Sequence, residues 1–126
     1  MRISRTCRVR ETTLKAYYYL RATFKIESNE SESYVFEKII LEGINKVDEI
    51  TKDGKTILFP NYKGKRYVIG GNLSTETNNI VMDLCDKQNW QIQECFEIMI
   101  YLSAKERLTE DEQNFFGLNN MKIAIV

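Results

Sequence analysis

The same order of elements is predicted twice along this chain, and this repeat limits its fold more than any other feature. Residues 3–9 alternate in polarity as a strand does, and residues 66–73 form a second short strand. Two amphipathic helices follow each strand. One strand and two helices amount to about 40 residues, which are too few to bury a core alone. We therefore expect two units to fold around each other, with their strands paired antiparallel and the four helices packed beneath them.

Apolar side chains at helical spacing mark the four helices. The stripes run from Leu14 to Phe24, from Phe36 to Val47, from Ile80 to Cys85 and from Ile92 to Ile100. The residues that can cap these helices are Thr12 or Thr13, Ser31 or Ser33, and Ser74 or Thr75. Thr109–Glu112 is typical of the start of a short extra helix.

These patterns divide the chain into four parts. Residues 1–50 form the first unit, 51–65 a polar connection, 66–108 the second unit and 109–126 a C-terminal tail. The connection is either a hairpin arm or a partly ordered linker, and the apolar tail has no predicted place. We expect the two units to form one folded domain.

Histidine is absent from the 126 residues, and its absence removes the commonest general base together with the commonest metal ligand. The three cysteines (Cys7, Cys85 and Cys95) show no CxxC spacing and cannot complete a zinc site alone. We interpret them as reduced thiols, with Cys85 and Cys95 in the core. No catalytic constellation is visible. The sequence therefore predicts a protein that is not an enzyme and binds no metal or cofactor.

No apolar run approaches the roughly 18 residues that a membrane span needs. The N-terminal residues also lack the apolar stretch of a secretory signal. We therefore expect a cytoplasmic protein without a membrane partner.

The net charge is zero, but charges of each sign are segregated along the chain. Residues 1–25 hold seven basic residues against one acidic, and residues 51–70 hold five against one. Residues 26–50 and 71–126 are acidic in compensation. A binding surface depends on local charge, so basic strands above acidic helices favour an anionic partner.

The pattern resembles the ribbon-helix-helix family, which includes the Arc, MetJ and CopG repressors. Two units in one chain look most like the TraY proteins of conjugative plasmids. The closest stretch runs from Leu73 through Ser74–Val81 to Asp86–Trp90 and into Gln91–Glu94. The resemblance implies a mainly α fold with one short antiparallel two-stranded ribbon, which is a tandem ribbon-helix-helix pseudo-dimer in a single chain.

The resemblance also implies a function. It is sequence-specific binding of double-stranded DNA, as a relaxosome accessory factor, a transcriptional regulator of plasmid transfer, or both. The expected partners besides DNA are the relaxase or other relaxosome proteins. We expect a monomer in solution, with several copies on adjacent DNA sites.

A two-stranded ribbon is narrow enough to enter the major groove, and alternation sends every second side chain toward the bases. The predicted base contacts are Ser4, Thr6, Arg8 and Asn72. The predicted phosphate contacts in the strands are Arg2, Arg5, Arg10, Lys65 and Arg66. By resemblance, amides at the start of each unit's second helix add Ser33, Gln91 and Gln93 to the phosphate contacts.

Two alternatives stay open. One is a ribbon-helix-helix repressor or antitoxin in which residues 106–126 bind a partner. The other is an α+β protein-interaction module with no DNA role. In that module residues 55–59 and 65–70 form a central β-hairpin and Met121–Val126 adds a strand.

Overall fold

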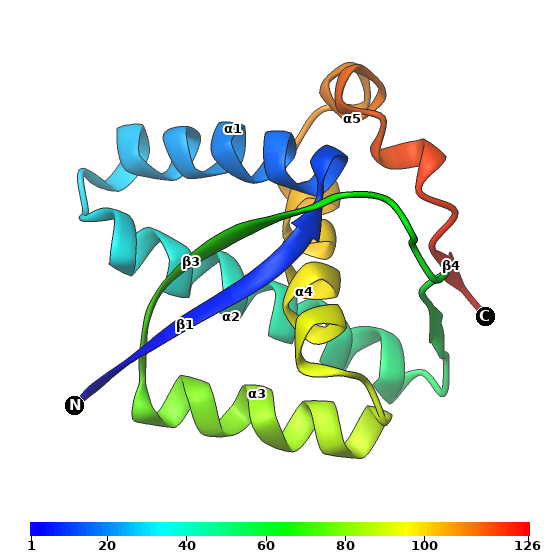
Figure 1. The fold of residues 1–126 in the computed structure, drawn as a ribbon, viewed down its shortest axis with the longest axis horizontal. Coiled ribbons are helices and arrows are strands. Elements are labelled where there is room, and N and C mark those ends of the chain that lie inside the picture. The colour runs from blue at the N-terminus through cyan, green and yellow to red at the C-terminus, as the bar shows by residue number, and fades with distance from the viewer.

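Four strands and five α-helices make up the chain, and the computed structural model describes all 126 residues (Figure 1). The first half contains β1 (Arg2–Arg10), α1 (Glu11–Ser28), α2 (Glu32–Lys52) and β2 (Ile57–Leu58). The second half contains β3 (Arg66–Ser74), α3 (Thr75–Gln88), α4 (Ile92–Arg107), α5 (Glu110–Phe116), the 3₁₀ turn η1 (Leu118–Asn120) and β4 (Ala124–Ile125).

The sheets show that the predicted fold class was wrong. A tandem ribbon-helix-helix pseudo-dimer contains one short ribbon, whereas this chain forms two separate two-stranded sheets, β1–β3 and β2–β4. The second sheet arises because Ile57 and Leu58 pair antiparallel with Ile125 and Ala124. Burial of Ile57 secures this pairing. The 51–65 connection and the C-terminal tail are therefore joined to each other.

The β1–β3 ribbon crosses in front of the helices (Figure 1). Its register pairs Arg2 with Ser74 at one end and Arg10 with Arg66 at the other, through nine residue pairs. Residues 66–74 therefore pair with β1, so the central hairpin of the alternative module does not form. The tail does add a strand, as that alternative expected, but it pairs with β2.

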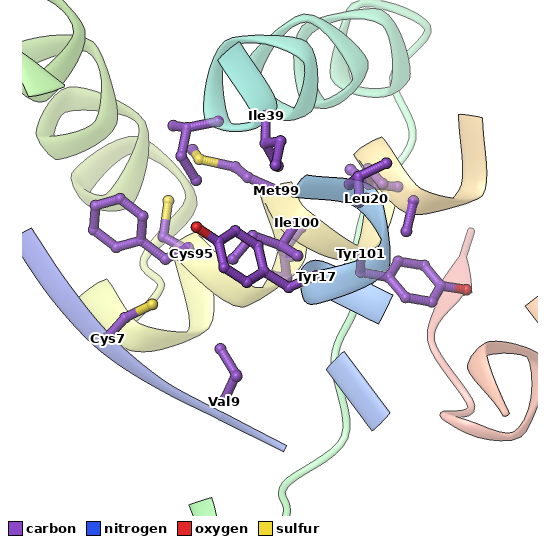
Figure 2. Packing of buried hydrophobic residues seen from close by; sticks show 14 of the residues in the cluster. Cys7, Val9, Tyr17, Leu20, Ile39, Cys95, Met99, Ile100 and Tyr101 are labelled. Carbon is purple, nitrogen blue, oxygen red and sulfur yellow. The ribbon is translucent and has the colours of Figure 1, made fainter. Parts of the chain in front are cut away.

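One side of the ribbon packs on the helices and the other faces away from them. Cys7 and Val9 of β1 point into the core, where Tyr17 of α1 and Cys95 of α4 meet them (Figure 2). All three cysteines are buried and free. Central helix α4 is buried without interruption from Cys95 to Ala104.

The two halves use equivalent contacts. Asn29 and Asn89 end α1 and α3 in the left-handed conformation that asparagine tolerates. Phe36 of α2 stacks on Phe96 of α4, with ring centroids 6.2 Å apart and planes 27° apart. Gly71 of β3 lies against Phe36, where an added Cβ atom would come within 2.7 Å of Phe36 Cβ and 2.8 Å of the ring carbon Cγ. Glycine at this strand position therefore makes room for the aromatic pair.

Helices α2 and α4 cross closely because residue 43 has no side chain. A Cβ atom on Gly43 would lie 2.4 Å from the carbonyl oxygen of Met99. Four residues further along α4, the Ser103 hydroxyl donates a hydrogen bond to the carbonyl oxygen of Ile39. The crossing holds the two halves together through the close approach of the helix backbones at Gly43 and the hydrogen bond from the Ser103 side chain.

We predict that Gly43→Ala lowers the free energy of unfolding by roughly 1–3 kcal/mol, because the added methyl group meets backbone that cannot move aside cheaply. Urea denaturation measures the loss. Asn45→Ala, at an exposed position of α2, is the control and should change stability by about 0.5 kcal/mol or less. Equal stability of Gly43→Ala and the wild type would show that the crossing is not tight.

Candidate nucleic-acid interface

The outer face of the ribbon presents a row of polar side chains. Ser4, Thr6 and Arg8 of β1 are exposed, and none of their side chains forms a hydrogen bond or ion pair within the protein. The residues opposite them on β3 are Asn72, Gly70 and Val68 respectively. The structure thus places the four predicted base contacts on one face, with Asn72 directly opposite Ser4.

The predicted phosphate contacts in β1 lie differently. The guanidinium of Arg5 is on the inner side, where its Nε donates to Asn78 Oδ1 of α3 at 2.6 Å. Arg10 is buried, with 7% of its surface exposed, and donates to the carbonyl oxygen of Pro60. Arg2 remains at the rim but is engaged with Glu37. Arg5 and Arg10 therefore support the ribbon from within the fold.

A fully buried carboxylate explains the position of Arg10. Glu97 of α4 is 0% exposed, and its Oε2 accepts hydrogen bonds from the Arg10 backbone amide at 3.0 Å and from the Thr13 hydroxyl at 2.7 Å. The guanidinium groups of Arg10 and Arg66 lie 3.9 and 3.8 Å from the same carboxylate. Phe59 and Tyr62 cover Arg10, 4.5 and 5.0 Å from its guanidinium carbon to their ring centroids.

The other end of the ribbon has the equivalent arrangement. Glu37 of α2 accepts hydrogen bonds from the Ser74 backbone amide and from Arg2 Nη1, both at 2.7 Å. Burial raises the pKa of this carboxyl group, but hydrogen bonds from Ser74, Arg2 and Thr77 outweigh burial and lower the pKa to about 2. Glu37 is therefore ionised at neutral pH and holds Arg2 beside the ribbon.

Sequence reasoning missed both glutamates as anchors of the interface. A signal was present, since Phe36-Glu37 and Phe96-Glu97 repeat one Phe-Glu pair at the same place in the two second helices. An acidic residue inside an apolar stripe indicates a buried partner of opposite charge.

A cavity of about 290 Å³ opens between one end of the ribbon and the start of α4. It is lined by Arg8 and Arg66 of the ribbon, Phe59, Pro60 and Asn61 before it, and Gln91, Gln93 and Glu94 of the α4 start. The Gln91 amide donates to the Glu94 carboxylate at 3.2 Å. Gln91 and Gln93 thus line the same cavity as two arginines, but the Gln91 backbone amide already donates to Glu94.

The remaining predicted contacts, Lys65 and Ser33, lie beside the ribbon. Lys65 is exposed, with its ammonium 5.2 Å from the Tyr67 ring centroid. Ser33 lies in the first turn of α2, where its hydroxyl is 3.5 Å from the Asn72 side-chain nitrogen. The structure therefore brings Ser33 to the Asn72 end and Gln91 to the Arg8 end of the ribbon.

Comparisons with protein-family models, curated proteins and solved structures gave no match to this chain. None of its helices combines the length and the apolar character needed to cross a bilayer. The site has to be interpreted from its own geometry.

We predict that Glu97→Gln lowers the free energy of unfolding by about 3–5 kcal/mol, because Arg10 then stays buried without an anion. Glu106→Gln in the same helix removes an exposed partner of Lys46 and should cost about 1 kcal/mol or less. Urea denaturation of both variants measures the difference. A loss for Glu97→Gln no larger than that of its control would contradict the anchoring role.

The lowered pKa of Glu37 predicts a specific acid sensitivity. Its folded-state pKa of about 2 lies below the ordinary value of 4.5, so its stabilising contribution is complete above pH 4.5 and disappears as pH falls toward 2. Over this window the unfolding free energy of Glu37→Gln should decline less steeply than that of the wild type. Urea denaturation at stepped pH provides the comparison, and parallel declines would contradict the prediction.

Proposed function

We propose that this protein binds double-stranded DNA sequence-specifically by inserting the β1–β3 ribbon into the major groove. The observation that carries the proposal is the outer ribbon face, where Ser4, Thr6 and Arg8 are exposed and have no partner in the protein. Paired strands lie about 4.8 Å apart, and a major groove about 12 Å wide admits such a ribbon with its side chains.

Each outer side chain suits a particular base edge. The Arg8 guanidinium can donate two hydrogen bonds to the O6 and N7 atoms of guanine. Asn72 can pair in the same way with adenine, while Ser4 and Thr6 can donate to or accept from several bases. Val68, exposed opposite Arg8, can contact a thymine methyl group.

The phosphate contacts that we propose differ from the sequence-based set. Lys65, Arg66 and Arg2 lie at the rims of the ribbon and are at least partly exposed, so they can meet the DNA backbone. Gln91 and Gln93 lie beside Arg66, while Ser33 lies at the opposite end. Arg5 and Arg10 are omitted because their guanidinium groups are used inside the protein.

The biological role follows from the resemblance to TraY proteins alone. We infer a cytoplasmic protein that acts at a plasmid transfer origin, as a relaxosome accessory factor, or as a regulator of transfer genes. Relaxase and other relaxosome proteins are the partners that such a role implies. The proposed DNA-binding activity can be tested without assuming any of these roles.

We predict that Arg8→Ala weakens binding to a preferred duplex by roughly 1–3 kcal/mol and relaxes preference at one base pair. The duplex is obtained by selection from a random-sequence library, and transfer-origin fragments are tested beside it. Salt-titrated gel shifts on selected and scrambled duplexes separate base readout from phosphate contacts.

Lys15→Ala is the matched control, because it removes one exposed positive charge from α1 outside the ribbon. It should leave the preference for the selected duplex unchanged. If Arg8→Ala binds the selected and scrambled duplexes as the wild type does, the outer ribbon face is not the reading surface.

A further inference from the structure

Short helix α5 exposes a face that no other part of the fold covers. Its outward residues are Glu110, Asp111, Asn114 and Phe115, which we name the acidic knob. Phe115 is 83% exposed, although its ring rests edge-on against Phe116. Neither Glu110 nor Asp111 has an ion-pair partner. The knob therefore combines unbalanced negative charge with an exposed aromatic ring.

A concave surface of the opposite charge lies where α2 and α3 end. This basic groove has a volume of about 560 Å³ and is lined by Lys52, Lys55 and Lys87 together with Thr51, Gly54, Gln88 and Asp48. The three lysines form no ion pairs, and they outnumber the single carboxylate of Asp48. Lys55 also lines an adjoining hollow, which contains Ile125 together with Glu49 and Asp53. The Ile125 side chain is about half exposed.

We propose that the acidic knob of one copy docks into the basic groove of the next copy, so that the chain associates in solution instead of remaining the monomer that the sequence predicted. Carboxylates of the knob then meet lysines that lack partners, and Phe115 meets the half-exposed side chain of Ile125. Knob and groove are different surfaces, so the contact is heterologous and can continue from copy to copy.

The positions of the two surfaces suit such a row. In Figure 1 the knob helix α5 is at the top, and the ends of α2 and α3 are at the lower right. The β1–β3 ribbon faces the viewer between these levels. Copies stacked in one orientation would therefore present their ribbons on the same side.

Sedimentation equilibrium of the full chain without DNA tests the proposal separately from DNA binding. At low salt the weight-average mass should rise with concentration beyond that of a dimer, and added salt should reverse the rise. The knob variant carries Glu110→Gln, Asp111→Asn and Phe115→Ala, and the groove variant carries Lys52→Gln, Lys55→Gln and Lys87→Gln. Each variant alone should raise the apparent Kd roughly tenfold or more.

Mixing the two variants gives the sharpest result. Each retains one intact surface, so an equimolar mixture should form one-to-one pairs and nothing longer. A control variant with Glu76→Gln, Asp83→Asn and Ile26→Ala removes equally exposed groups from α3 and α1 and should associate as the wild type does. Circular dichroism and urea midpoints confirm that each variant is folded.

Several outcomes would overturn the proposal. One is that the wild type stays at 14.8 kDa at every concentration. The others are that the mixture of the two variants stays monomeric, or that the control variant loses association as strongly as the knob and groove variants do. A groove variant that loses DNA binding but associates normally would instead assign the three lysines to DNA phosphates.

Discussion

The ribbon depends on two glutamates inserted beneath its ends, one from α2 and one from α4. Each connects parts of both halves. Glu37 joins Arg2 of its own half to the Ser74 amide of the other, and Glu97 joins Arg66 to the Arg10 amide in the same way. A two-stranded ribbon alone is marginally stable in water. These charged hydrogen bonds hold the positions where β1 leads into α1 and β3 leads into α3. Because each glutamate binds residues of both halves, the strand of each half depends on the other half.

The same glutamates decide which cations remain for a partner. The first 25 residues hold seven basic side chains, which suggests a strongly positive surface. In the fold, Arg2 and Arg10 pair with carboxylates and Arg5 binds Asn78. Arg8 is the arginine of β1 that keeps a free guanidinium on the outer face. In the proposed complex Arg8 is therefore the arginine of β1 that reads a base, while Arg2, Arg5 and Arg10 stabilise the ribbon.

Local patterns predicted much of the fold correctly. Alternation in β1 identified Cys7 and Val9 as inward and Thr6 and Arg8 as outward, and the apolar stripes located the four long helices. Where these patterns failed, a contact between residues far apart in the sequence decided the local structure. Helix α1 begins at Glu11, before the predicted threonine caps, because the Arg10 amide is satisfied by a carboxylate 87 residues away.

Long-range pairing also explains the missed second sheet. Strands β2 and β4 have two residues each, which is too short for a period of two to be visible. Their pairing depends on where the tail returns after α5, and local sequence does not contain that information. The burial of Arg10 was invisible for the same reason, because its carboxylate comes from α4 and its two covering aromatic rings come from the connection before β3.

The two strands differ on the outer face, and this difference has a consequence for recognition. β1 presents Ser4, Thr6 and Arg8, whereas β3 presents Asn72, Gly70 and Val68 opposite them. Two identical strands would favour a palindromic site. Here Gly70 offers no side chain beside Thr6, and the single free arginine lies toward one end. The DNA site that such a ribbon would read is therefore asymmetric. A head-to-tail row of copies would keep the same orientation from one site to the next.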